Sequence, residues 1–140
     1  MIPSKEKLEE IVKELQKIMR IQDWDIEVKL CTAKEMQRDT GDFENMGEAF
    51  RNIRHKYSVI RLNAQDEDNE KEWYHTLVHE LKHVQTTEFI YVFQKIFDNL
   101  EMPDNVRKVY REQVDDLYEQ WMNVCAREFI TMYPESRFFN

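Results

Sequence analysis

Residues 76–84 read Thr-Leu-Val-His-Glu-Leu-Lys-His-Val, a stretch with the periodicity of a half-buried helix. Residues four apart on an α-helix lie on one face, one turn from each other, so the imidazoles of His79 and His83 can point at the same atom. At about 100° per residue, Leu77 and Leu81 fall on a different face. The pattern therefore predicts a helix that buries its leucine face and turns its histidine pair toward a cleft.

The His-Glu-x-x-His pattern on a helix is typical of a zinc site. His79 and His83 would supply two imidazole ligands. Glu80 lies about 100° around the helix from His79, so it would flank the ion rather than bind it. That is the position of a general base acting on a metal-activated water. The sequence thus predicts Zn²⁺ as the cofactor and Glu80 as the catalytic residue.

A catalytic zinc has three protein ligands and one open position, so a third group must come from elsewhere in the chain. Thr86 and Phe89 stand where the longer pattern HExxHxxGxxH requires glycine and histidine, which excludes that pattern. Because no histidine follows His83, a downstream carboxylate is the better candidate. Four acids of the last expected helix share one face: Glu112, Asp115, Asp116 and Glu119.

Residues 76–84, preceded by an alternating segment at 57–63, resemble the minimal zincin-like metallopeptidases encoded by phages and bacteria. The resemblance covers about residues 22–130. In those proteins a last helix carries a glutamate ahead of an apolar, alanine-containing segment, and residues 119–126 are similar to it.

The resemblance implies Glu119 as the third zinc ligand, with Glu112 and Asp115 as alternatives. Trp121 and Cys125 depart from the family pattern, because they replace smaller aliphatic residues. We expect Cys125 to be an apolar core residue and not a ligand.

Local patterns divide the chain into helices and strands around a loop at 39–47. Helices are expected at 4–20, 69–99 and 104–132, the second with a bend after Thr86 and Thr87, and a helical turn at 32–38. Strands are expected at 24–30, 48–53 and 57–63. The expected class is α+β. With the resemblance, this implies a zincin-like fold with an N-terminal helix, a small and mainly antiparallel sheet of three to four strands, the active-site helix and a long C-terminal helix.

Composition sets the wider expectations. A chain of 140 residues fits one domain over 1–140. Its net charge of −8 repels phosphate backbones and anionic membranes, so we expect no membrane partner, and nucleic acid would need a local basic patch to bind. The expected partner is a peptide or protein substrate, as the resemblance implies. Cys31 and Cys125 have no CxxC partner, which favours a reducing compartment, and no apolar segment resembles a signal peptide. The expected location is the cytoplasm.

The leading functional hypothesis is peptide-bond hydrolysis. By resemblance, the strand at 57–63 would be the sheet edge that pairs with an extended substrate. His75 and Tyr118 are candidates, among other nearby tyrosines, for the donor that stabilises the transition-state oxyanion.

Two hypotheses belong to other classes. One is a zincin-like metal-binding protein with a structural, regulatory or protein-binding role and no proteolysis. The weakest is association with nucleic acid, which only the short basic stretches 51–56 and 107–111 suggest.

Overall fold

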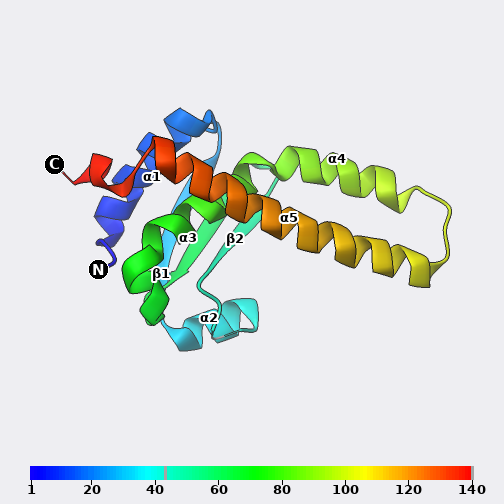
Figure 1. The fold of residues 1–140 in the computed structure, drawn as a ribbon, viewed down its shortest axis with the longest axis horizontal. Coiled ribbons are helices and arrows are strands. Elements are labelled where there is room, and N and C mark those ends of the chain that lie inside the picture. The colour runs from blue at the N-terminus through cyan, green and yellow to red at the C-terminus, as the bar shows by residue number, and fades with distance from the viewer. Residues whose placement is uncertain (43, 140) are drawn as a thin grey trace.

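The computed structural model describes residues 1–42 and 44–139, so Phe43 of the expected loop and Asn140 lie outside the described residues. The elements, in chain order, are α1 (Lys5–Met19), β1 (Asp25–Cys31), α2 (Ala33–Thr40), β2 (Gly47–Asn52), β3 (Tyr57–Asn63), α3 (Glu67–Gln85), α4 (Thr87–Asp98), α5 (Asp104–Met132) and a 3₁₀ helix (Glu135–Phe138). The α+β class is confirmed, with the N-terminal helix, small sheet, histidine-bearing helix and long C-terminal helix shown in Figure 1.

Helix α1 begins and ends where the sequence predicts. The side chain of Ser4 accepts a hydrogen bond of 3.3 Å from the backbone N–H of Lys7, which satisfies one of the free donors of the first turn. Arg20 ends the helix in a left-handed conformation with φ of 59°. The apolar stripe that includes Leu8 and Leu15 is buried in the core. The expected capped amphipathic helix over 4–20 is confirmed.

The sheet has three strands in the order β1-β3-β2. Strand β2 pairs antiparallel with β3 through a short connection, whereas β1 pairs parallel with β3, from Asp25 opposite Tyr57 to Cys31 opposite Asn63. The parallel pairing arises because the chain passes through α2 and β2 before it returns beside β1. The sheet is therefore mixed, and the expectation of a mainly antiparallel sheet is corrected in this respect.

Strand β3 is the centre of the sheet and not an edge. It is hydrogen-bonded to a neighbour on both sides, and Ser58, Ile60 and Leu62 have no exposed surface. The expectation that 57–63 is the edge available to a peptide is therefore wrong, because the backbone groups on both sides of the strand are already hydrogen-bonded to neighbouring strands. Strand β2 occupies an outer position instead, next to α3.

Helix α3 lies against the sheet and contributes much of the core. Asp66 caps it by accepting hydrogen bonds from the backbone N–H groups of Asp68 and Asn69 at 2.9 and 3.2 Å. Leu77, Val78 and Leu81 are fully buried, as the apolar stripe predicts. Their burial against the sheet fixes the rotation of the helix and therefore the direction of its histidines.

The helix expected over 69–99 is divided in two at Thr86. This residue has φ of −97° and ψ of 4°, and its hydroxyl donates to the carbonyl of Lys82 at 2.9 Å. A side-chain bond of this kind competes with the backbone ladder. The predicted bend is confirmed as a break between α3 and α4.

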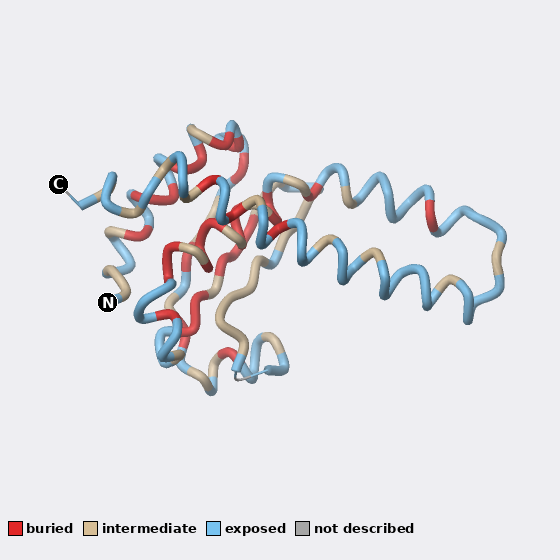
Figure 2. The backbone as a smooth tube through the Cα atoms, in the orientation of Figure 1, coloured by how far each residue is buried: buried red, intermediate tan, exposed pale blue. Residues whose placement is uncertain are grey.

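Helices α4 and α5 run antiparallel and project together beyond the sheet, with the loop at 99–103 at the far end (Figure 1). Figure 2 shows that this projection is exposed along most of its length. We call α4, the loop and residues 104–118 the arm. Within residues 1–42 and 44–139, no helix is both long enough and apolar enough to span a membrane.

Candidate metal centre

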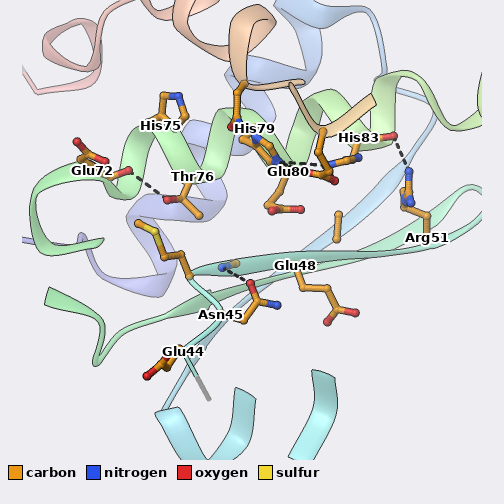
Figure 3. Close-up of a pocket in the computed structure, with 15 residues that line it drawn as sticks. Glu44, Asn45, Glu48, Arg51, Glu72, His75, Thr76, His79, Glu80 and His83 are labelled. Carbon is orange, nitrogen blue, oxygen red and sulfur yellow. Dashed lines mark hydrogen bonds and ion pairs between the residues drawn. The ribbon is translucent and has the colours of Figure 1, made fainter. Parts of the chain in front are cut away.

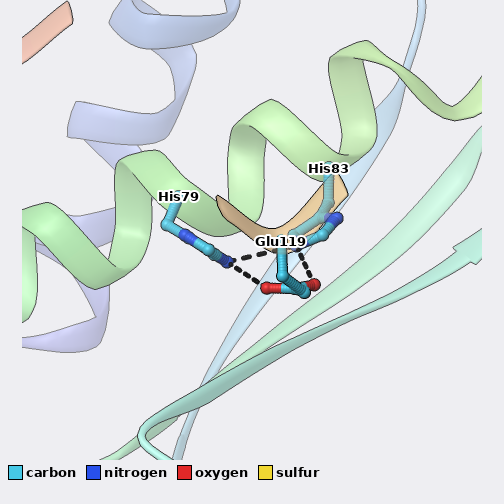
Figure 4. Close-up of side chains that lie close together, drawn as sticks. All are labelled: His79, His83 and Glu119. Atoms are coloured by element: carbon cyan, nitrogen blue, oxygen red, sulfur yellow. Dashed lines mark hydrogen bonds and ion pairs between the residues drawn. The ribbon is translucent and has the colours of Figure 1, made fainter. Parts of the chain in front are cut away.

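His79 and His83 lie one turn apart on α3, and Glu119 reaches them from α5 (Figure 4). The Nε2 atoms of the two histidines are 3.1 Å apart. One carboxylate oxygen of Glu119 lies 3.2 Å from Nε2 of His79, and the other lies 2.9 Å from Nε2 of His83. Three donor atoms from two helices therefore converge on one point.

This spacing fits a small tetrahedral cation. Zinc–nitrogen and zinc–oxygen bonds of about 2.0–2.2 Å give a tetrahedron with edges of roughly 3.3–3.6 Å. The observed separations are slightly shorter, so an outward movement of less than about 1 Å would accommodate zinc. Two imidazoles and one carboxylate are also ligands that zinc accepts. In the part of the chain that the structure describes, this is the one group of three or more His, Cys, Asp or Glu side chains whose donor atoms lie close enough to hold a metal ion, and it has three members.

Helix α5 carries Glu119 to the site because its second half packs on α3. Met122, Ala126 and Phe129 form the buried stripe of α5, at spacings of four and three residues. Glu119 lies one turn before Met122 and borders that stripe. Its side chain remains 56% exposed, whereas those of His79 and His83 are 13% and 8% exposed. The carboxylate therefore covers one side of the histidine pair and itself remains in contact with solvent.

His79 and Glu119 shift each other's pKa values. Burial alone would lower the pKa of His79, but hydrogen bonding to Glu119 and the nearby charge of Glu80 raise it overall. Hydrogen bonds from His79 and His83 hold the pKa of Glu119 well below its ordinary value. The carboxylate is therefore ionised at neutral pH, which is the form that binds a cation.

Glu80 lies beside the cluster and faces the sheet. Burial raises its pKa to about 7, and only 7% of the residue is exposed. A cation bound nearby would favour its ionised form. Strand β2 approaches it closely at Gly47, where an added Cβ atom would lie 2.6 Å from Cγ2 of Thr76 and 3.5 Å from Cγ of Glu80. A larger residue here would force Thr76 or the strand to shift.

A cleft of about 760 Å³ opens beside the cluster. Helix α3 forms one wall, with His75, Thr76, His79, Glu80 and His83, and β2 with the preceding residues 44–46 forms the opposite wall (Figure 3). Glu119 and Asn123 of α5 complete the lining. The cluster thus has an open side from which a water or a substrate can approach.

The structure places the remaining predicted residues around this centre. His75 lies one turn before His79, with ring centroids 6.5 Å apart, and lines the cleft. Tyr118 packs its ring 5.0 Å from that of His83, and its hydroxyl hydrogen-bonds to Thr86. Tyr118 lines the hollow between α4 and α5, as does Asp115, an alternative third ligand. Neither Glu112 nor Asp115 belongs to the converging group.

Two residues at the site were not predicted from sequence. Asn123 hydrogen-bonds to His79, and a partner of this kind orients a metal-binding imidazole. Arg51 donates to the backbone carbonyl of His83 at 3.1 Å and lines the cleft. Asn123 could have been found from the sequence, because it lies four residues after Glu119 and therefore on the same face of the helix. Nothing local in the sequence connects Arg51 to α3.

Other charged and sulfur-bearing residues have structural surroundings of their own. Lys56 forms ion pairs with Asp23 and Glu88, and Arg111 forms one with Asp98. Arg107 donates hydrogen bonds to the carbonyls of Phe97 and Leu100. Part of each basic stretch is therefore engaged within the chain. Both cysteines are free thiols: Cys31 is buried, whereas Cys125 is partly exposed on α5. The expectation that Cys125 is a core residue is therefore corrected.

Comparisons with protein-family models, with curated proteins and with solved structures gave no match. The class of site therefore follows from its residues. Two histidines at HxxxH spacing on one helix and a glutamate from a second helix form a group that could hold a metal ion and is consistent with a zincin-like site.

Proposed function

We propose that this protein is a zinc-dependent peptidase of the zincin-like kind, with His79, His83 and Glu119 as the metal ligands. The observation that carries the proposal is the convergence of three donor atoms at separations of 2.9–3.2 Å beside an open cleft. A structural zinc site is closed by four protein ligands, whereas a catalytic site keeps one position open. The three-membered group found among the described residues favours the catalytic type.

Zinc would supply Lewis-acid chemistry here, lowering the pKa of a bound water and polarising the scissile carbonyl. Glu80 accepts the proton that the attacking water loses and passes it to the nitrogen of the departing amine. Asn123 keeps His79 oriented. His75, on the cleft wall, is the candidate donor for the oxyanion. Together these groups would cleave one peptide bond with one water.

Strand β2 is the element that would hold an extended substrate. It is an outer strand, and in the described residues only β3 pairs with it. Gly47, Ala49 and Arg51 alternate along the strand and line the cleft beside the two histidines. An added peptide strand on this side would place its backbone along the cluster. This assignment replaces β3, whose hydrogen-bonding groups are used on both sides.

The test combines metal analysis with cleavage of a peptide library. We expect the purified chain to retain about one zinc per molecule after dialysis and to cleave peptides. Glu80→Gln should keep the zinc and lose cleavage by at least about 100-fold, because the base is removed and no ligand is. Glu72→Gln, a carboxylate of the same cleft wall but outside the cluster, is the matched control and should retain activity.

Two outcomes would contradict the proposal. Unchanged turnover in Glu80→Gln would remove Glu80 from the mechanism. Full zinc occupancy without cleavage of any peptide would favour the second candidate, a zincin-like metal-binding protein with a structural, regulatory or protein-binding role. The large exposed apolar side chains of the arm support this second candidate.

A further inference from the structure

The arm carries many large apolar side chains that the chain itself does not cover. In α4, Phe89, Val92 and Ile96 are 66%, 55% and 60% exposed. In α5, Leu117 is 64% exposed. Figure 2 shows few buried positions along the whole projection. A two-helix projection of this kind gains little stability from its own packing.

Most of the exposed apolar residues of the two helices lie on one side of the arm, with Tyr91 and Val109 as exceptions. The helices contact each other along a seam that includes Ile90 and Phe97 of α4 and Val114 and Tyr118 of α5. At about 100° per residue, the exposed apolar stripe of each helix is offset from this seam by roughly 110° in the same rotational sense. Since antiparallel neighbours are related by a two-fold axis, equal offsets place both stripes on the same face.

We call these residues the apolar face. Its members share exposure of at least 37% and the same side of the seam: Phe89, Val92 and Ile96 of α4, and Val106, Tyr110, Leu117, Trp121 and Val124 of α5. None of them carries a charge. Their exposed fractions correspond to roughly 900 Å² of accessible surface, above the 300–600 Å² of the largest patch on a typical monomer and near the roughly 800 Å² that each partner contributes to a stable complex.

We propose that the apolar face is a dimer interface, and that its occupant is the same face of a second copy of this chain. The α5 residues Val106, Tyr110, Leu117 and Val124 are separated by four, seven and seven residues, the repeat of helices that pack in bundles. Two arms packed face to face complete a four-helix bundle around the members of the face between Phe89 and Leu117, and Trp121 and Val124 extend the contact along α5 beyond the arm. Such an isologous contact uses one self-complementary patch twice.

Charge limits where two copies can meet and disfavours a membrane as the occupant. A molecule with net charge −8 repels its own copies over most of its surface, so a contact between copies requires an uncharged face of this size. A membrane surface would require a basic border, as amphipathic membrane-bound helices have. In residues 87–118 acidic side chains outnumber basic ones, which disfavours an anionic bilayer.

The proposed dimer leaves the metal cluster accessible. Leu117 and Glu119 are separated by about 200° around α5, so the apolar face and the carboxylate lie on opposite sides of the helix. The interface therefore does not depend on the proposed peptidase activity. The dimer and the peptidase activity can therefore be tested separately, and either proposal can fail without the other.

Sedimentation velocity of the full chain, over a hundredfold range of concentration, tests the proposal. We expect a species of twice 17.2 kDa at the higher concentrations. Leu117→Glu and Ile96→Glu should each raise the dissociation constant by about 100-fold or more, because an unpaired carboxylate would be buried in the contact. Both residues are exposed in the isolated chain, so circular dichroism and zinc content should be unchanged.

Tyr91→Glu is the matched control. Tyr91 is 42% exposed on α4 but lies on the opposite side of the arm, so the dimer should persist in this variant. A wild-type chain that stays monomeric throughout overturns the proposal, and a dimer that Leu117→Glu does not weaken overturns it as well. A monomer that binds vesicles of anionic phospholipid, with binding lost in Leu117→Glu, would assign the face to a membrane.

Discussion

The body of the molecule and the arm are built from similar proportions of apolar residues, but the body buries far more of them. Leu77, Leu81 and Ile60 are completely covered between α3 and the sheet, whereas Phe89 and Leu117 of the arm remain about two-thirds exposed. Helix α5 belongs to both regions. Its first half lies in the arm, and its second half packs on α3 and presents Glu119 to the histidines.

The difference indicates what each region is for. A rigid, fully packed α3 holds two imidazoles in place before any metal arrives, and preorganised ligands reduce the cost of binding. The proposed third ligand, Glu119, comes from a helix that is packed on one half and free on the other. The precision of the site therefore depends on the contact between α5 and α3, and the arm is available for a contact outside the chain.

The largest expected effect comes from a truncation in the body. Leu81→Ala should lower the free energy of unfolding by about 2–5 kcal/mol, because it leaves a cavity in a fully buried cluster. Leu100→Ala, the same change at a half-exposed position in the arm loop, should cost less than about 1 kcal/mol. Urea denaturation followed by circular dichroism measures both. Equal losses would remove the distinction between the two regions.

The next effect concerns the junction between them. Glu119→Ala should weaken zinc binding by about 100-fold or more, because one of three ligands is lost. Glu112→Ala, two turns earlier on α5 and outside the converging group, should bind zinc as the wild type does. Competition with a chromophoric chelator gives the dissociation constants. Should the Glu112 variant lose zinc and the Glu119 variant keep it, the third ligand has been assigned to the wrong turn.

A smaller effect tests how tightly β2 fits against α3. Gly47→Ala should destabilise the fold by about 1–3 kcal/mol, since the new Cβ atom would lie 2.6 Å from Cγ2 of Thr76. Thr76→Ser removes that methyl group and keeps the hydroxyl that bonds to Asn69 at 2.7 Å. The double variant should recover much of the loss in thermal denaturation. Without such recovery, the contact with Thr76 is not the cause.

The smallest effect appears only at high pH, at the C-terminal end of α5. Tyr74 donates a hydrogen bond of 2.6 Å to the carbonyl of Tyr133, and burial raises its pKa from 10.0 to about 12. The stabilisation is fully present below pH 10 and is lost as the pH rises toward 12, because the unfolded chain ionises first.

Tyr74→Phe should therefore flatten the dependence of unfolding free energy on pH in that interval, relative to wild type. It should also lower stability at pH 7 by about 1 kcal/mol through the lost hydrogen bond. Urea titrations at a series of pH values provide the measurement. An unchanged slope would show that the tyrosine hydroxyl is not protected as the structure indicates.

Local sequence determined most of the elements and two members of the metal group. Strand 57–63 and helix 104–132 coincide with the observed bounds, and the capped helix after Ser4 ends within a residue of its expected position. These features depend on periodicity and capping, which act over a few residues. The pairing of His79 with His83 is equally local, because one helical turn is enough to bring them together.

Only the tertiary structure decided which strand borders the cleft and which acid completes the cluster. The place of β3 between β1 and β2 depends on the path of the whole chain, so an alternating pattern could not reveal that it is central. Glu112, Asp115 and Glu119 share one face in sequence. Glu119 alone of the three joins the histidines, because the buried stripe from Met122 to Phe129 fixes where α5 crosses α3. The sequence of a helix fixes which side chains each turn carries, and packing between distant segments decides which turn lies at the site.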